Sequence, residues 1–126
     1  RATSKPWALR SKATTLALKV NTTSLTFGDS SPIAAMTLPA NNIISAIDVI
    51  VDAAFNGTPS ASVGIAGTPS KYLSATSVDL TGVARYSVHP NMAAPVANEP
   101  VVITYAAGGA TQGSGRVLIY YAEPAA

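Results

Sequence analysis

The chain has 126 residues and no cysteine, and only 11% of its residues are charged, compared with about 25% in an ordinary soluble domain. This length accommodates one domain with one core, and the lack of cysteine excludes disulfides, thiolate metal sites and cysteine nucleophiles. Charges are costly to desolvate. A low charge content is therefore typical of a protein whose surface is largely covered by neighbours. No apolar run approaches the roughly 18 residues of a membrane-spanning helix, so we expect no membrane partner.

The start of the chain is basic and differs from the rest. No acid precedes Asp29, and the segment shows no strand alternation. We therefore predict an extended basic arm over residues 1–13 and a folded domain over residues 14–126. Since the charges are sparse for nucleic acid, we expect an acidic protein surface as the partner of the arm. The residues that we expect to bind this partner are Arg1, Lys5, Trp7, Arg10 and Lys12.

Trp7 is the only tryptophan of the chain, and it follows Pro6 in this arm. An indole is costly to leave in water, so two fates are open. It can fold back on its own domain, or it can anchor the arm in a pocket of a partner, because Trp and Arg are over-represented among interface hot spots.

Strand patterns dominate the remainder. From Ser45 to Phe55 the residues alternate between two faces, which predicts a long half-buried strand. One face carries Ile47, Val49, Val51, Ala53 and Phe55, and the other carries Asp48 and Asp52. Asn56-Gly57 then favours a turn, and we predict a hairpin that leads into Ala61–Ile65. A second hairpin is predicted where the glycine-rich segment 108–115 joins Val101–Ala106 to Arg116–Tyr121. Further strands are predicted at Thr14–Val20, Ser24–Phe27, Ile33–Leu38, Tyr72–Leu80 and Val83–His89.

The segment from His89 to Pro100 contains three prolines, and we predict a surface loop there rather than a central strand. The pattern as a whole gives eight or nine short strands and no amphipathic helix. It predicts an all-β domain, an antiparallel β-sandwich or jelly roll with an extended N-terminal arm.

Residues suited to catalysis are few. His89 is the only histidine, and no G-x-S-x-G motif accompanies it. Asp48 and Asp52 share one strand face but lie about 13 Å apart along it, too far for a glycosidase pair. We expect them to solvate the sheet face or to pair with basic groups of a neighbour. The glycine-rich segment lacks lysine and leads into a strand, so it is not a phosphate loop. We predict no catalytic, metal or cofactor site.

The segment from Thr37 to Glu123 resembles a β-sandwich module of tailed-bacteriophage virion proteins. Such modules occur in capsid cement (decoration) proteins and in fibre or tail proteins. The residues that carry the resemblance are Thr37-Leu38-Pro39-Ala40, Ala54-Phe55-Asn56-Gly57-Thr58, Ser62-Val63-Gly64-Ile65-Ala66-Gly67, Lys71-Tyr72-Leu73, Val78-Asp79-Leu80-Thr81, Val101-Val102-Ile103-Thr104-Tyr105 and Val117-Leu118-Ile119-Tyr120-Tyr121.

A single module with a basic arm and no shaft or repeat is more similar to cement than to fibre. The resemblance implies a structural virion protein on the outer surface of the capsid, with the major capsid protein and further copies of itself as partners. A receptor- or glycan-binding domain of a tail spike or fibre is the main alternative. A viral hydrolase fragment is a third possibility, which the lack of site chemistry disfavours. The resemblance does not extend to the arm, whose role rests on its composition.

Overall fold

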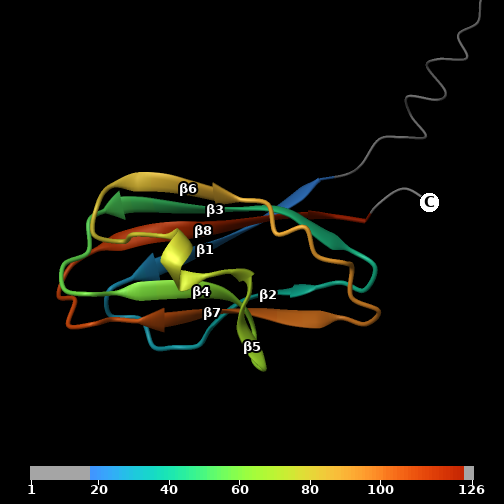
Figure 1. Ribbon diagram of the computed structural model, residues 1–126, viewed down its shortest axis with the longest axis horizontal. Coiled ribbons are helices and arrows are strands. Elements are labelled where there is room, and N and C mark those ends of the chain that lie inside the picture. The colour runs from blue at the N-terminus through green and yellow to red at the C-terminus, as the bar shows by residue number, and fades with distance from the viewer. Residues whose placement is uncertain (1–17, 124–126) are drawn as a thin grey trace, which may run out of the picture.

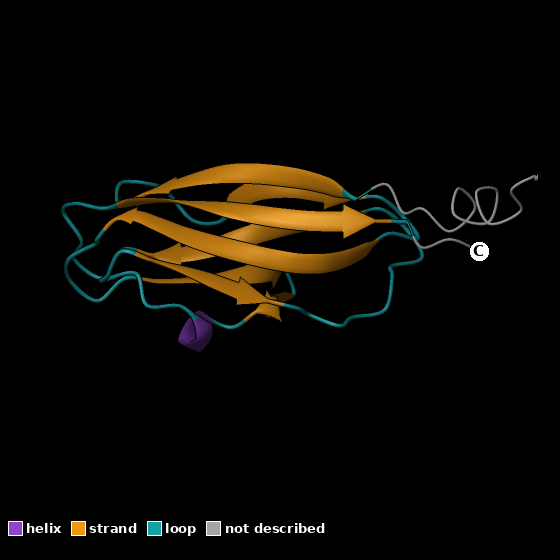
Figure 2. Ribbon diagram, turned by 90° about the horizontal axis from the view of Figure 1, so that it is seen from above, coloured by secondary structure: helices purple, strands orange, loops and turns teal. Residues whose placement is uncertain are grey.

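The computed structural model describes residues 18–123, and the predicted arm over residues 1–13 lies outside them. The described chain forms two antiparallel four-stranded sheets that face each other (Figures 1 and 2). The strands are β1 (Lys19–Thr26), β2 (Ile33–Leu38), β3 (Ile43–Ala53), β4 (Ser60–Ile65), β5 (Thr68–Leu73), β6 (Ala84–Val88), β7 (Glu99–Ala106) and β8 (Ser114–Ala122), with a single 3₁₀ turn, η1 (Ala75–Ser77), after β5.

The strand order defines the fold. One sheet has the order β1-β8-β3-β6 and the other has the order β2-β7-β4-β5. Of the connections between consecutive strands, only β4–β5 joins hydrogen-bonded neighbours, and every other connection crosses from one sheet to the other. This is the arrangement of a jelly roll, so the predicted all-β sandwich is confirmed.

Both predicted hairpins are wrong. β3 and β4 lie in different sheets, as do β7 and β8, so the segments 54–59 and 107–113 bridge the sandwich. Alternation of apolar and polar residues specifies which side chains point inward, but it does not specify the sheet that the next strand joins.

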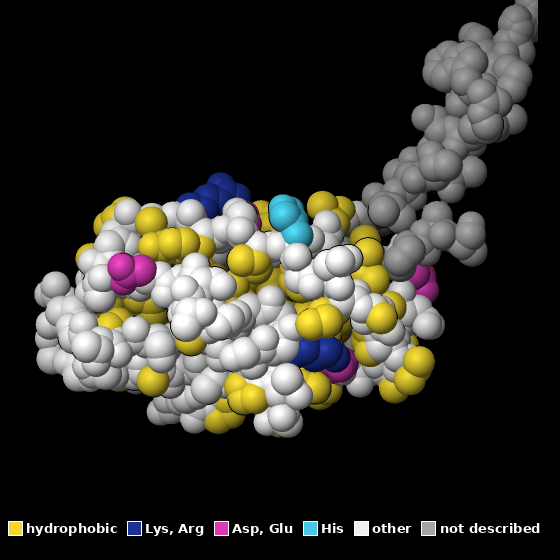
Figure 3. Space-filling model, viewed as in Figure 1, with side chains coloured by type: hydrophobic (Ala, Val, Ile, Leu, Met, Phe, Trp, Pro, Cys, Tyr) yellow, Lys and Arg dark blue, Asp and Glu magenta, His cyan; other side chains and the backbone are white. Residues whose placement is uncertain are grey.

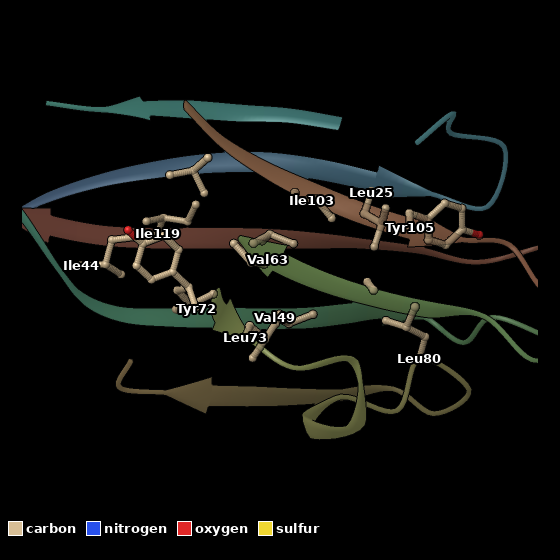
Figure 4. Close-up of a cluster of buried hydrophobic side chains, with 14 of the residues drawn as sticks. Leu25, Ile44, Val49, Val63, Tyr72, Leu73, Leu80, Ile103, Tyr105 and Ile119 are labelled. Atoms are coloured by element: carbon tan, nitrogen blue, oxygen red, sulfur yellow. The ribbon is translucent and has the colours of Figure 1, made fainter. Parts of the chain in front are cut away.

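The core lies between the sheets and follows the alternation of β3. Ile47, Val49 and Val51 are buried as predicted, and so is Phe55. Ala53 is exposed, because the register with β8 shifts between Val51 and Ala53. The opposing sheet presents a matching set, and Figure 4 shows how the two sets interlock. The fully buried side chains from the other strands include Leu25, Leu38, Val63, Val101, Ile103, Val117 and Ile119, and Leu80 joins them from the segment before β6.

Two predictions of strand boundaries were wrong. β1 runs without a break where two strands were predicted, because Asn21–Thr23 pair with Val117–Ile119 of β8. The strand predicted over Tyr72–Leu80 ends at Leu73, where the Ser74 hydroxyl accepts a hydrogen bond from Thr76 N and starts η1.

Pro100 lies inside β7, a central strand, although the sequence placed it in a loop. At this position β7 pairs only with Thr37 of β2, because the pairing with β4 begins at Val102. The missing N–H of proline therefore removes no hydrogen bond on the β4 side.

The two bridging segments at one end of the sandwich are joined by polar contacts. The Asn56 Oδ1 atom accepts hydrogen bonds from the backbone N of Thr111 at 2.7 Å and of Gln112 at 3.2 Å. Thr58 N donates to the Gly108 carbonyl oxygen at 2.9 Å. Gly108 has a φ of +58°, and a Cβ there would lie 2.1 Å from the Thr58 carbonyl oxygen. The close approach of the two segments therefore requires glycine.

Gly108→Ala and Gly109→Ala test this contact as a matched pair. Both glycines have a positive φ, but a Cβ at Gly109 meets no atom within 4 Å. Each alanine should cost about 1–2 kcal/mol for the left-handed backbone. Gly108→Ala should cost ~1–3 kcal/mol more, because the Thr58 backbone must move. Urea unfolding of both variants measures the difference, and equal midpoints would show that the two segments do not depend on this contact.

Candidate interaction surfaces

The residues suited to catalysis do not converge. Within residues 18–123, no three His, Asp or Glu side chains lie close enough together to hold a metal ion. No helix in this part of the chain is long and apolar enough to cross a membrane. His89 directly follows β6, and its Nδ1 atom lies 3.2 Å from the Ser45 carbonyl oxygen. Figure 3 shows this side chain on the surface, where charged groups are few and dispersed.

Asp48 is the most buried side chain of the ion pairs among the described residues. It lies on the outer face of β3, where its side chain is only 7% exposed. Arg85 forms an ion pair with one carboxylate oxygen, and the Ser87 hydroxyl donates to the other at 2.6 Å. Burial acts to raise the pKa of Asp48, but the hydrogen bonds from Ser87 and Arg85 outweigh it and hold the pKa below its ordinary value.

Asp52 pairs with a different strand. Arg116 of β8 donates to both of its carboxylate oxygens, at 2.9 and 3.0 Å, and these hydrogen bonds lower the pKa of Asp52. From the sequence, one expectation was that these two aspartates pair with basic groups of a neighbouring protein. The structure supplies the basic groups from adjacent strands of the same sheet, 37 and 64 residues away.

Asp48→Asn and Asp52→Asn make the same chemical change at a buried and an exposed position of β3. Asp48→Asn should lower the free energy of unfolding by about 1–3 kcal/mol, because the buried carboxylate of Asp48 loses its ion pair with Arg85. Asp52→Asn should change it little, because exposed pairs contribute little. Thermal unfolding of both variants against the wild type measures the contrast.

The pH dependence gives the Asp48 prediction a second readout. Because its pKa is lower in the folded state, the stabilisation is present above the unfolded pKa of about 4 and is lost as pH falls through the folded value. The difference in melting temperature between the wild type and Asp48→Asn should therefore be full at neutral pH and shrink below about pH 4. A difference that stays constant with pH would contradict the ion-pair explanation.

A third ion pair joins two strands of the other sheet. Lys71 of β5 lies 2.8 Å from Glu99 of β7, and the buried Tyr72 donates its hydroxyl proton to the other Glu99 oxygen. Burial acts to raise the pKa of Glu99, but these two hydrogen bonds keep it below its ordinary value. The sequence analysis did not find this cluster, since its members are 27 and 28 residues apart and no local pattern links them.

These pairs use most of the positive charge of the folded part. Residues 18–123 contain four basic side chains, and Lys71, Arg85 and Arg116 are each bonded to a carboxylate. Lys19 is the remaining one. The positive charge available to a partner therefore lies at Lys19 and in the predicted arm, whose residues Arg1, Lys5, Trp7, Arg10 and Lys12 lie outside the described residues.

A shallow groove of about 530 Å³ lies beside the same cluster. The β4–β5 turn forms one wall and the Pro95–Asn98 segment forms the other, while Pro100 and Val102 contribute to its lining. The lining is mainly apolar, and Val96 is 94% exposed at the rim. The sequence predicted the proline-rich loop but not the groove, because the β4–β5 turn that completes it is remote in sequence.

Comparison with known proteins gives matches of structure only. No protein-family model and no curated protein matches the sequence. A chain of the cyanophage Pam1 capsid asymmetric unit is similar, with a TM-score of 0.62 and 24% identity, and 86% of each chain is covered. A chain of the acid-stable capsid of Helicobacter pylori bacteriophage KHP30 matches with a TM-score of 0.67 and 16% identity, covering 83% of this chain and 86% of that one.

A third similar chain comes from the capsid of Ralstonia phage GP4, with a TM-score of 0.58 and 16% identity, over 89% of this chain and 86% of that one. At these identities the likeness establishes a shared fold. Each match covers 83–89% of this chain.

Proposed function

We propose that this chain is a structural virion protein, without enzymatic activity, that cements or decorates the outer surface of a tailed-phage head. It clamps neighbouring major-capsid subunits and contacts further copies of itself. The observation that carries the proposal is the likeness of nearly the whole sandwich to chains in three phage capsid structures. A fold alone does not specify a function, so the composition and the distribution of charge supply the remaining support.

Sparse charge on the folded domain suits this role. Three ion pairs are satisfied within the described residues, so the sandwich brings few charges that a neighbour must desolvate. The mainly uncharged surface fits close packing in an array, where many weak contacts act together.

In this proposal, the basic arm binds the protein to the capsid. Arg1, Lys5, Arg10 and Lys12 face carboxylates of the capsid, and Trp7 anchors the arm in a pocket. Ordering about a dozen residues costs on the order of ten kcal/mol, so the contacts must act together. No groups beyond the arm and the sandwich are needed, and no cofactor or metal takes part.

Deletion of residues 1–12 tests the role of the arm. The melting temperature of the sandwich should stay nearly unchanged, because its core lies within residues 18–123, while occupancy on heads should fall severely. Trp7→Ala should weaken head binding by about 2 kcal/mol, the scale of an interface anchor. Val83→Ala, which truncates an exposed apolar side chain of the sandwich, is the control and should leave occupancy unchanged.

Cryo-electron microscopy of labelled virions gives the decisive readout. An ordered array over the head supports cement. A few copies at the tail would instead support the receptor- or glycan-binding alternative. If the deletion lowers the melting temperature by many degrees and the remaining protein still decorates heads, the arm belongs to the fold and its proposed role is wrong.

A further inference from the structure

We propose that β1 is an interface strand, through which two copies of this chain pair edge to edge in antiparallel orientation. The two sheets that contain β1 then form one continuous sheet across a two-fold axis. This inference deepens the self-association that is part of the proposed function, by naming the surface and its occupant.

The four edge strands of the sandwich differ in how they are protected. β5 contains Pro69, β2 has a register shift between Ala34 and Met36, and β6 has only five residues with Arg85 on its outer face. Prolines, bulges, short length and charges are the devices that prevent edge pairing. β1 has no proline and no register shift, it is longer than β6, and its single charge lies at its first residue. Its eight residues keep an unbroken register with β8, and Lys19 is its only charged residue.

Exposed apolar side chains gather at the two ends of β1. Six large apolar side chains are exposed among residues 18–123. Three of them flank or begin this strand, with Leu18 57% and Val20 51% exposed at its start and Phe27 41% exposed just after its end. Antiparallel pairing places the start of each strand beside the end of its partner. It therefore places Leu18 and Val20 of one copy at the same end of the joined strands as Phe27 of the other.

The charges at this edge favour the same orientation. No charged residue lies between Val20 and Gly28, so no like charges oppose each other along the strands. Antiparallel pairing also places Lys19 of each copy at the end of the partner strand that Asp29 follows, while parallel pairing would bring the two lysines together. The unpaired backbone groups of an antiparallel edge are self-complementary about a two-fold axis, which makes a second copy the fitting occupant.

This geometry has a consequence for the arm. Residues 1–17 precede β1, so in an antiparallel pair the two N-terminal segments start from opposite ends of the joined strands. One dimer then carries its two N-terminal segments at two separate points, as a clamp between neighbouring capsid subunits requires.

Placing a charge on the edge tests the interface. Thr22 and Thr68 are both exposed residues of edge strands, in β1 and β5 respectively, so Thr22→Lys and Thr68→Lys form a matched pair. Sedimentation equilibrium of the full chain should show a wild-type dimer. Thr22→Lys should raise the dimer dissociation constant at least tenfold, and Thr68→Lys should leave it unchanged. Circular dichroism establishes that both variants are folded. A monomeric wild type, or equal effects of the two lysines, would overturn the proposal.

Cysteine crosslinking locates the axis, and the chain is suited to it because it has no cysteine of its own. Thr22→Cys, Thr23→Cys and Ser24→Cys scan the middle of β1, and Ser70→Cys on the β5 edge is the control. At least one β1 variant should form an interchain disulfide faster than the control under mild oxidation. If none does, β1 is not the interface.

Head binding separates this inference from the proposed function. A monomeric wild type that still decorates heads would refute β1 pairing and leave the cement role intact. A β1-paired dimer that binds no head would refute the cement role and confirm the interface.

Discussion

The structure depends on the packing of two apolar sheet faces against each other. β3 and β8 at the centre of one sheet present Ile47, Val49, Val117 and Ile119, and β7 and β4 at the centre of the other present Ile103 and Val63; all six are at most 2% exposed. Because burial of branched apolar side chains is the main driving force, this layer fixes the distance and alignment of the sheets. Every connection except β4–β5 must then span this layer. The connecting segments therefore have to be long enough to reach the other sheet, and they need polar contacts of their own at the ends of the sandwich.

Those polar contacts hold the segments that cross between the sheets. Asn56 holds the 107–113 segment through its side chain, and Gly108 allows the two backbones to approach. Asp48 and Asp52 each pair with a basic residue on an adjacent strand, and Glu99 of β7 pairs with Lys71 of β5, which lies beyond β4 in the same sheet. These contacts align strands that meet only after the chain has crossed between sheets. They also satisfy most of the charge of the folded domain internally, which leaves a surface suited to close contact with other proteins.

In the proposed function, the sandwich and the N-terminal part of the chain therefore have different roles. The sandwich pairs three of its four basic side chains internally and has one charge on the β1 edge, while five of the eight basic residues of the chain lie within its first 19 residues. The same fold occurs in chains of three phage capsid structures at identities of 16–24%. At such divergence the likeness shows a shared fold and leaves the role of the chain to be argued from its own residues.

The sequence alone determined the fold class, most strand positions and the inward face of β3, because period-two alternation records which side chains avoid water. It also predicted a basic arm over residues 1–13, which lies outside the described residues. Only the tertiary structure decided which strands are neighbours, since alternation carries no information about pairing partners. The partners of Asp48, Asp52 and Glu99, the groove beside Pro95–Asn98 and the unprotected edge of β1 all depend on that pairing. They bring together residues that are far apart in the chain, and their positions follow from how the sheets assemble around the core.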